Sequence, residues 1–235
     1  MITTISEKVI RPLLALVVAG FFGTAQAIVV YDNGGPTAFS GSETTGWTQA
    51  EDFNIASGAS ITGATVYLAG LGDLSAWDNV LDYFVYSDAS GTPGVILTSG
   101  AAQNKTVTDT GIPWCCGGNA FLVDFDFEAA FQAAASTTYW LGIHASSDFD
   151  IDDIYWVTTD FNGTSPGREC LGCTEGPFTM DPIGPLEHAF QLEGTMLTPP
   201  AEVPEPASVI LLSFGLGALA LRRRRKISPA VSKNA

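Results

Sequence analysis

The acidic run from Asp148 to Asp153 is the densest group of side chains that could bind a metal ion or act chemically. In an extended chain Asp148, Asp150 and Asp152 share one face, and their like charges repel unless water or a cation separates them. Ca²⁺ takes about 6–8 oxygen ligands, which carboxylates supply. The run lacks the glycine and distal glutamate of an EF-hand loop. A solvated acidic loop is the default interpretation, and a calcium site of Asp148, Asp150, Asp152 and Asp153 is the alternative.

The four cysteines are Cys115, Cys116, Cys170 and Cys173. An even number in an exported chain favours two disulfides. A bridge between Cys115 and Cys116 would be strained, because neighbouring Cα atoms lie only about 3.8 Å apart. We therefore predict two cross-links between the 115–116 pair and the 170–173 pair, with their register open. A zinc site of all four cysteines is the weaker alternative, because only one C-x-x-C half is present.

Hydrolase signatures are incomplete. Gly163 to Gly167 matches G-x-S-x-G around Ser165, and Asp181 and His188 follow in hydrolase order. That motif needs a strand, a sharp turn and a helix, whereas prolines and glycines crowd this segment, so we expect a loop.

Other candidate catalytic pairs are equally weak. Asp124 and Asp126 share a strand face as a glycosidase pair might, but ordinary sheet surfaces carry such pairs. His144 and His188 are the only histidines, too few for a three-histidine zinc site, and we expect both to be partly buried strand residues. These patterns predict that the protein is not an enzyme.

Trp47 and Trp77 lie in loop-like stretches near glycine and aspartate. Exposed aromatic rings stack on sugar rings, and Asp78 and Asn79 offer partners for hydroxyl groups. Core packing is the default for most of the five tryptophans. Trp47 and Trp77 are the two candidates for a glycan-binding edge.

The sequence pattern predicts that β-strands position these residues. Turn residues recur every 8–12 positions or so between β-rich runs. Leu81, Tyr83 and Val85 alternate onto one face, and Phe121 to Phe127 alternates strictly. The only helix-like patch is the alanine-rich segment 128–135. The pattern predicts an all-β fold, an antiparallel β-sandwich or jelly roll of about nine strands.

Charge is distributed unevenly. Residues 28–198 hold two basic and 22 acidic residues, a net charge of −20, and eight of the ten basic residues lie near the two ends. A domain of this charge repels phosphate backbones, so nucleic-acid binding is excluded.

The two ends of the chain have the patterns of targeting segments. Two basic residues, a short apolar run and the small pair Ala25 and Ala27 predict a signal peptide over 1–27. The predicted sandwich covers 28–198, a proline-rich linker 199–206, an apolar helix with basic residues 207–226, and a cytoplasmic tail 227–235. The apolar part is short for a span of about 20 residues, which fits a transient anchor.

The C-terminal order resembles the PEP-CTERM sorting signal of Gram-negative bacteria, a tail also labelled an ice-binding protein C-terminal domain. The residues that carry this resemblance are Val203, Pro204, Glu205, Pro206, Arg222, Arg223, Arg224 and Arg225. The resemblance implies anchoring in the inner membrane, processing by an exosortase, and delivery to the cell surface or extracellular matrix of an exopolysaccharide producer.

The central region is similar to domains often found with this signal, on segments 31–34, 49–53, 87–94 and 139–143. That likeness implies a β-sandwich and no established activity. We expect a non-enzymatic surface or matrix protein that associates with extracellular polysaccharide. The alternatives are a secreted hydrolase acting on a polysaccharide or ester, and a self-associating coat protein.

Overall fold

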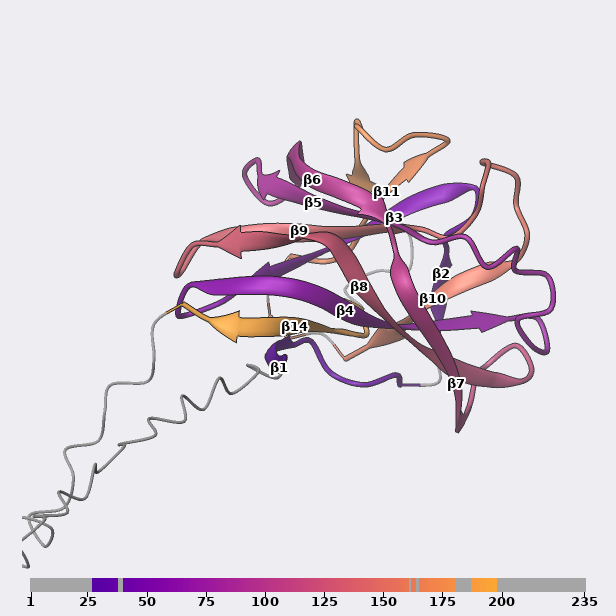
Figure 1. Cartoon of the computed structure of the whole chain (residues 1–235). Coiled ribbons are helices and arrows are strands. Elements are labelled where there is room, and N and C mark those ends of the chain that lie inside the picture. Colours follow the sequence, from indigo (N-terminus) through magenta and orange to yellow (C-terminus); the bar gives the residue numbers. More distant parts are fainter. Residues whose placement is uncertain (1–26, 38–39, 161, 164, 181–186, 198–235) are drawn as a thin grey trace, which may run out of the picture.

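The computed structural model describes residues 27–37, 40–160, 162–163, 165–180 and 187–197. The described chain is all-β, with fourteen strands and no helix (Figure 1). Within these ranges nothing has the helical length and apolar character needed to cross a membrane. The predicted signal peptide with Ala25, the sorting motif and the anchor helix lie outside the described residues, and Ala27 is exposed just before the first strand.

The strands form two antiparallel sheets. The eight-stranded sheet has the path β1-β14-β4-β10-β13, with β2 on β10, β8 on β4 and β7 on β8. Its strands are β1 (Ile28–Asp32), β2 (Gly41–Glu43), β4 (Ala59–Gly70), β7 (Gln103–Pro113), β8 (Asn119–Ala133), β10 (Ile154–Thr159), β13 (Glu187–His188) and β14 (Phe190–Met196).

The six-stranded sheet has the order β12-β11-β3-β9-β5-β6. Its strands are β3 (Trp47–Asn54), β5 (Asp82–Asp88), β6 (Pro93–Ala101), β9 (Thr138–His144), β11 (Arg168–Leu171) and β12 (Thr179–Met180).

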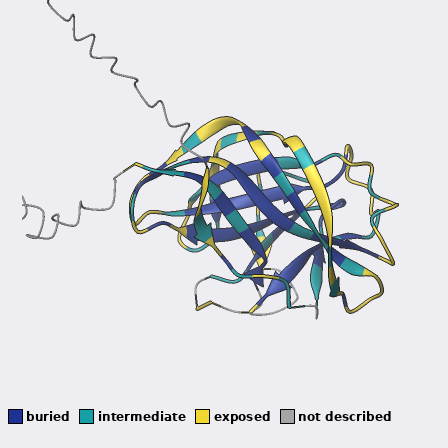
Figure 2. Ribbon diagram, turned by 60° about the horizontal axis from the view of Figure 1, so that its bottom comes forward, coloured by how far each residue is buried: buried dark blue, intermediate teal, exposed yellow. Residues whose placement is uncertain are grey.

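One core fills the space between the sheets, as in a β-sandwich. Phe53, Tyr83 and Leu141 from the six-stranded sheet join Phe125 and Trp156 from the eight-stranded sheet in a single buried cluster. Buried residues run through the inner strands, while exposed residues line the outer ones (Figure 2). The alternation predicted around β5 is confirmed, because Leu81, Tyr83 and Val85 enter this cluster. On β8, Val123, Phe125 and Phe127 enter it as predicted, whereas Phe121 is only partly buried.

Two expectations about elements are wrong. The sequence predicted about nine strands, whereas the described chain also forms β2, β7, β11 and β12 and breaks the last predicted strand at Ala189. The alanine-rich patch at 128–135 is not helical, because β8 continues to Ala133 and pairs with β4 there, with Ala133 opposite Ala59. Sheet pairing overrides the local helix propensity of alanine.

Candidate functional site

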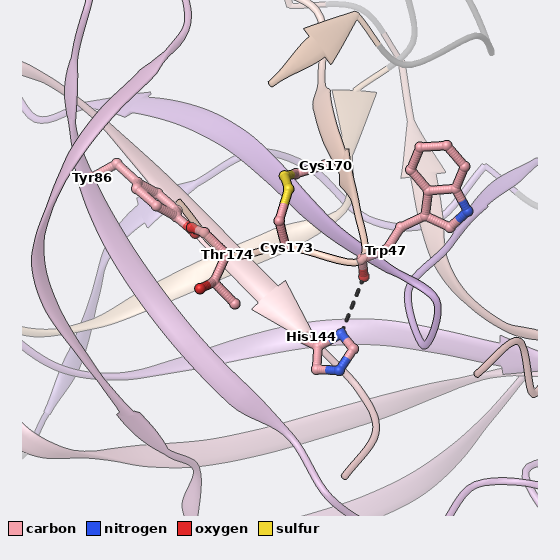
Figure 3. The surroundings of a disulfide bond; sticks show 6 residues. All are labelled: Trp47, Tyr86, His144, Cys170, Cys173 and Thr174. Atoms are coloured by element: carbon pink, nitrogen blue, oxygen red, sulfur yellow. Dashed lines mark hydrogen bonds between the residues drawn. A yellow bond between two sulfur atoms is a disulfide. The ribbon is translucent and has the colours of Figure 1, made fainter. Parts of the chain in front are cut away.

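One end of the sandwich gathers several of the predicted residues. Trp47 begins β3, His144 ends β9, and the loop with Asp148 follows directly. The Nδ1 atom of His144 lies 3.3 Å from the carbonyl oxygen of Trp47 (Figure 3), and its Nε2 atom lies 2.6 Å from that of Asp148. His144 is 4% exposed, so it is the buried link between the start of β3 and the acidic loop.

Three exposed apolar side chains lie around the start of β3, where Trp47 is partly buried. Leu171 of β11 pairs opposite Trp47 and is 61% exposed. Ile151, 63% exposed, lies against Gly46, and Phe149 stacks on His144 with ring centroids 4.2 Å apart. We call Trp47, Phe149, Ile151 and Leu171 the Trp47 edge. The sequence pointed to Trp47 alone, because the other three become neighbours only when β11 and the 145–153 loop fold against β3.

The predicted calcium ligands are not brought together. One carboxylate oxygen of Asp148 accepts a hydrogen bond from the backbone N–H of Asp150 at 3.1 Å, and Asp153 accepts one from the hydroxyl of Tyr155 at 2.9 Å. Asp152 is fixed through its backbone N–H. In the described part of the chain, no three of these four carboxylates form a group close enough to share an ion.

Trp77 differs from Trp47. Its Nε1–H donates to the carbonyl of Val80 at 2.8 Å, and its ring packs against the main core. The next residue, Asp78, accepts a hydrogen bond from the backbone N–H of Ser147 at 2.9 Å, which ties this loop to the acidic loop. Trp77 therefore braces the same end of the sandwich through its core contact, and like Trp47 it is partly buried.

The predicted cysteine pairing is wrong. Cys170 and Cys173 form a disulfide with each other, with Cα atoms 5.5 Å apart (Figure 3). Cys170 lies on β11 of the six-stranded sheet, whereas Cys115 and Cys116 lie in the turn between β7 and β8 of the other sheet. The disulfide closes the turn after β11, and the nearby carbonyl of Thr174 accepts a hydrogen bond from Tyr86 at 2.7 Å.

A second cluster lies buried where the two sheets meet. The ring of His188 has its Nδ1 atom 3.0 Å from a carboxylate oxygen of Glu51 and its Nε2 atom 2.8 Å from the hydroxyl of Ser42. The same Glu51 oxygen accepts the backbone N–H of His188 at 2.8 Å. Trp156 stacks on the histidine ring with centroids 4.5 Å apart. We call Ser42, Glu51 and His188 the buried relay.

The buried relay has the order of a nucleophile, a base and an orienting acid. Its members are almost fully enclosed, at 4% exposed for Ser42, 1% for His188 and 0% for Glu51. Acyl transfer needs a substrate carbonyl beside the serine oxygen, so this burial favours a structural role. The relay joins β2 and β13 of one sheet to β3 of the other.

Two further carboxylates adjoin the relay. Glu51, Asp52 and Glu187 have ligand oxygens within 4.8 Å of one another, and all three residues are buried. Burial and the charge of Glu51 raise the pKa of Glu187 to about 7, and burial also raises the pKa of Glu51. The amide of Asn33 donates to Glu187 at 3.3 Å. In the described chain this is the set of acidic oxygens close enough together to hold a hard cation, and it differs from the aspartates named as the alternative calcium site in the sequence.

Gly167 packs directly against the His188 ring and the Glu51 carboxylate of the buried relay. A Cβ atom at Gly167 would lie 2.7 Å from Cε1 of His188 and 3.2 Å from the Glu51 carboxylate. The ring cannot move aside, because Trp156 stacks on it and both of its nitrogens are engaged. Gly167→Ala should therefore lower the free energy of unfolding by about 1–3 kcal/mol.

The matched control is Gly35→Ala, because nothing lies within 4 Å of a Cβ atom there. Urea unfolding of both variants measures the difference. Equal stability of the two variants would show that the His188 ring is free to move away from position 167.

The remaining enzyme candidates are dispersed. Ser165 lies in a loop near Gly91, and Asp181 lies outside the described residues. Asp126 is exposed and accepts a hydrogen bond from Asn104 at 2.7 Å, while Asp124 accepts one from Thr65 at 3.4 Å. These contacts are those of an ordinary sheet surface.

The sequence reasoning missed Ser42, Glu51 and Glu187 as a site. The only local signal was a charged residue at an inward position of a strand, Glu51 between Gln49 and Phe53. His188 was expected to be a partly buried strand residue, whereas the structure encloses it almost completely, at 1% exposed.

The C-terminal end of the chain, which lies outside both clusters, matches a known family. Residues 202–226 match the family model of the PEP-CTERM protein-sorting motif. The chain carries a PEP-CTERM sorting motif. It is accordingly an exported protein that an exosortase sorts. The match covers the sorting tail and not the sandwich, and no curated protein matches the chain.

Proposed function

We propose that this PEP-CTERM protein is a non-enzymatic surface or matrix protein whose Trp47 edge contacts exopolysaccharide. The Trp47 edge carries the proposal, because a partly exposed tryptophan beside three exposed apolar side chains and a polar loop suits the faces and hydroxyl groups of sugar rings. The sorting motif supports delivery to the compartment where such polymers lie. The enclosed relay supports a role without turnover.

Charge restricts the class of polymer. The region 28–198 has a net charge of −20, and the acidic loop borders the Trp47 edge. Such a surface repels uronate-rich polymers at low salt. The preferred ligand is therefore an uncharged polysaccharide, bound mainly by stacking and hydrogen bonds.

Trp47→Ala tests this proposal. We expect retardation of the exported protein in gels containing the producer's exopolysaccharide, and about tenfold weaker retardation for the variant, as for loss of an aromatic anchor. Val95→Ala is the control. Val95 is 69% exposed on β6, which lies at the opposite edge of the six-stranded sheet from β11 and β12, so this variant should bind as the parent does. Circular dichroism verifies that both variants are folded.

Calcium and chelator arms separate the alternatives. Retardation that a chelator leaves unchanged supports stacking at the Trp47 edge. Retardation that a chelator abolishes would move the contact to bound calcium at the acidic loop. No retardation of the parent protein in either gel would reject the proposal, and light scattering against concentration would then test the coat-protein alternative.

A further inference from the structure

The turn between β7 and β8 holds Cys115 and Cys116, which are not part of the Cys170–Cys173 disulfide. This turn runs from Trp114 to Gly118 and is closed by its own backbone. The N–H of Trp114 donates to the carbonyl of Gly118 at 3.1 Å, and the N–H of Gly117 donates to the carbonyl of Trp114 at 3.4 Å. Gly117 and Gly118 have φ angles of 109° and 76°, which favour glycine.

The turn is also held against the body of the domain. Trp114 is 6% exposed, and its ring lies 5.0 Å from that of Tyr155 between centroids. A Cβ atom at Gly118 would collide with the carbonyl oxygen of Gly72, so the backbone of this turn packs tightly on the loop after β4. The two cysteines thus lie on a braced turn.

Both side chains are exposed, and their sulfur atoms lie 2.7 Å apart. That separation is well inside van der Waals contact, for which carbon atoms keep about 3.5–4.0 Å. Burial and the hydrogen bond shared with the Cys116 thiol raise the pKa of Cys115 to about 11. The Cys115 thiol is therefore protonated at neutral pH and a slow nucleophile, so oxidation at this sulfur depends on a thiol oxidase.

We propose that Cys115 and Cys116 form a vicinal disulfide in the exported protein, and that this turn is a site of thiol–disulfide exchange. The oxidant is a protein disulfide of the exported compartment. One cysteine sulfur attacks that disulfide and releases the first oxidant thiol. The second sulfur then displaces the oxidant's other sulfur. The pair loses two protons and two electrons, and the oxidant becomes two thiols.

The product is easily reduced. Adjacent Cα atoms lie about 3.8 Å apart, below the usual 4.4–6.8 Å of a disulfide, so the bridge is strained and open to attack by thiols. Cys170 and Cys173 lie 5.5 Å apart between Cα atoms, inside that range. The structure thus assigns the stable bridge to β11 and the exchangeable bridge to the β7–β8 turn.

Tryptic mapping tests the pairing directly, because Lys105 and Arg168 are the only cleavage sites between residues 28 and 198. Peptide 106–168 holds Cys115 and Cys116, and the next peptide holds Cys170 and Cys173. The full chain is exported in a bacterial host, denatured with an alkylating agent without reductant, and digested. We expect peptide 106–168 to lack alkyl groups and to be two hydrogen atoms lighter than the dithiol.

After reduction the same peptide should take two alkyl groups. Two alkyl groups without reduction, or a cross-link from peptide 106–168 to any other peptide, would overturn the proposal. The double variant Cys115→Ser/Cys116→Ser is the folding control. Because both side chains are exposed, its thermal transition should match that of the parent.

A dithiothreitol titration tests the exchange. Peptide 106–168 should become alkylated at a reductant concentration about tenfold or more below that for the Cys170–Cys173 peptide. Coincident midpoints would reject the assignment of an exchangeable site to this turn.

Discussion

Replacing Glu51 with alanine should lower the free energy of unfolding by about 3–5 kcal/mol, the usual cost of removing one partner of a buried ionic pair. Glu51 is fully buried and accepts two hydrogen bonds from His188, one from the backbone and one from the ring. Without the carboxylate, both donors of His188 lose this acceptor inside the core.

The control for this variant is Asp160→Ala, because Asp160 is exposed at the end of β10. Its substitution should change stability by less than about 0.5 kcal/mol. Glu51→Gln keeps the volume and one oxygen acceptor, so its loss should fall between the two. Urea unfolding followed by tryptophan fluorescence gives the three values. A Glu51→Ala loss as small as that of Asp160→Ala would mean that the buried relay adds little to the fold.

Ser42 separates a structural relay from a catalytic one. In a hydrolase, Ser42→Ala would abolish turnover while leaving the fold intact. In the structural interpretation, the serine hydroxyl satisfies the Nε2 atom of His188, so the variant is less stable and no activity is lost. The two roles therefore predict opposite outcomes for one substitution.

Alternation of apolar residues was enough to predict the central strands and their inner faces. It worked for β5 and β8 because apolar residues at every second position of each strand enter one continuous core. It failed for β7 (Gln103–Pro113), whose residues are mostly exposed and which pairs only with β8 in the described sheet. A strand without a buried face carries no such period, and the extended pairing that makes it a strand is not local information.

The sites depended even more on long-range pairing. Glu51 and His188 are 137 positions apart, and the disulfide pairing depends on which sheet receives β11. The Trp47 edge arises because the register of β3 and β11 places Leu171 opposite Trp47. Residue types alone identified Trp47 and His188 as notable. Their partners follow from sheet topology, which one sequence does not reveal.

Stability should fall as the pH rises from about 5 to 8, in contrast to the behaviour of a protein held by salt-bridged carboxylates. Glu187 has its pKa raised from the usual 4.5 to about 7 by burial and by the neighbouring charge of Glu51. The folded protein therefore binds the proton more tightly than the unfolded chain. This contribution is fully present below pH 4.5 and is lost as the pH passes through about 7.

The hydrogen bonds that Asn33 and Asn162 donate to Glu187 lower its pKa, but burial and the neighbouring carboxylates outweigh them. Asp52 and Glu51 add negative charge, and both also raise the pKa of Tyr31. His188, adjacent in the chain, is paired with Glu51. Ionising Glu187 therefore adds a third carboxylate charge to a buried group. We expect the free energy of unfolding to fall by about 2 kcal/mol between pH 5 and 8.

Glu187→Gln removes this titration and keeps the shape of the side chain. Its urea midpoint should vary less with pH than that of the parent, and the two proteins should differ most at pH 5, where the parent holds the proton. Glu175→Gln is the control at an exposed carboxylate and should follow the parent curve. If Glu187→Gln instead ran parallel to the parent from pH 5 to 8, another group would carry the dependence. If the parent gained stability over that range, Glu187 would titrate as an ordinary exposed glutamate, which its position in the carboxylate group at the junction of the two sheets argues against.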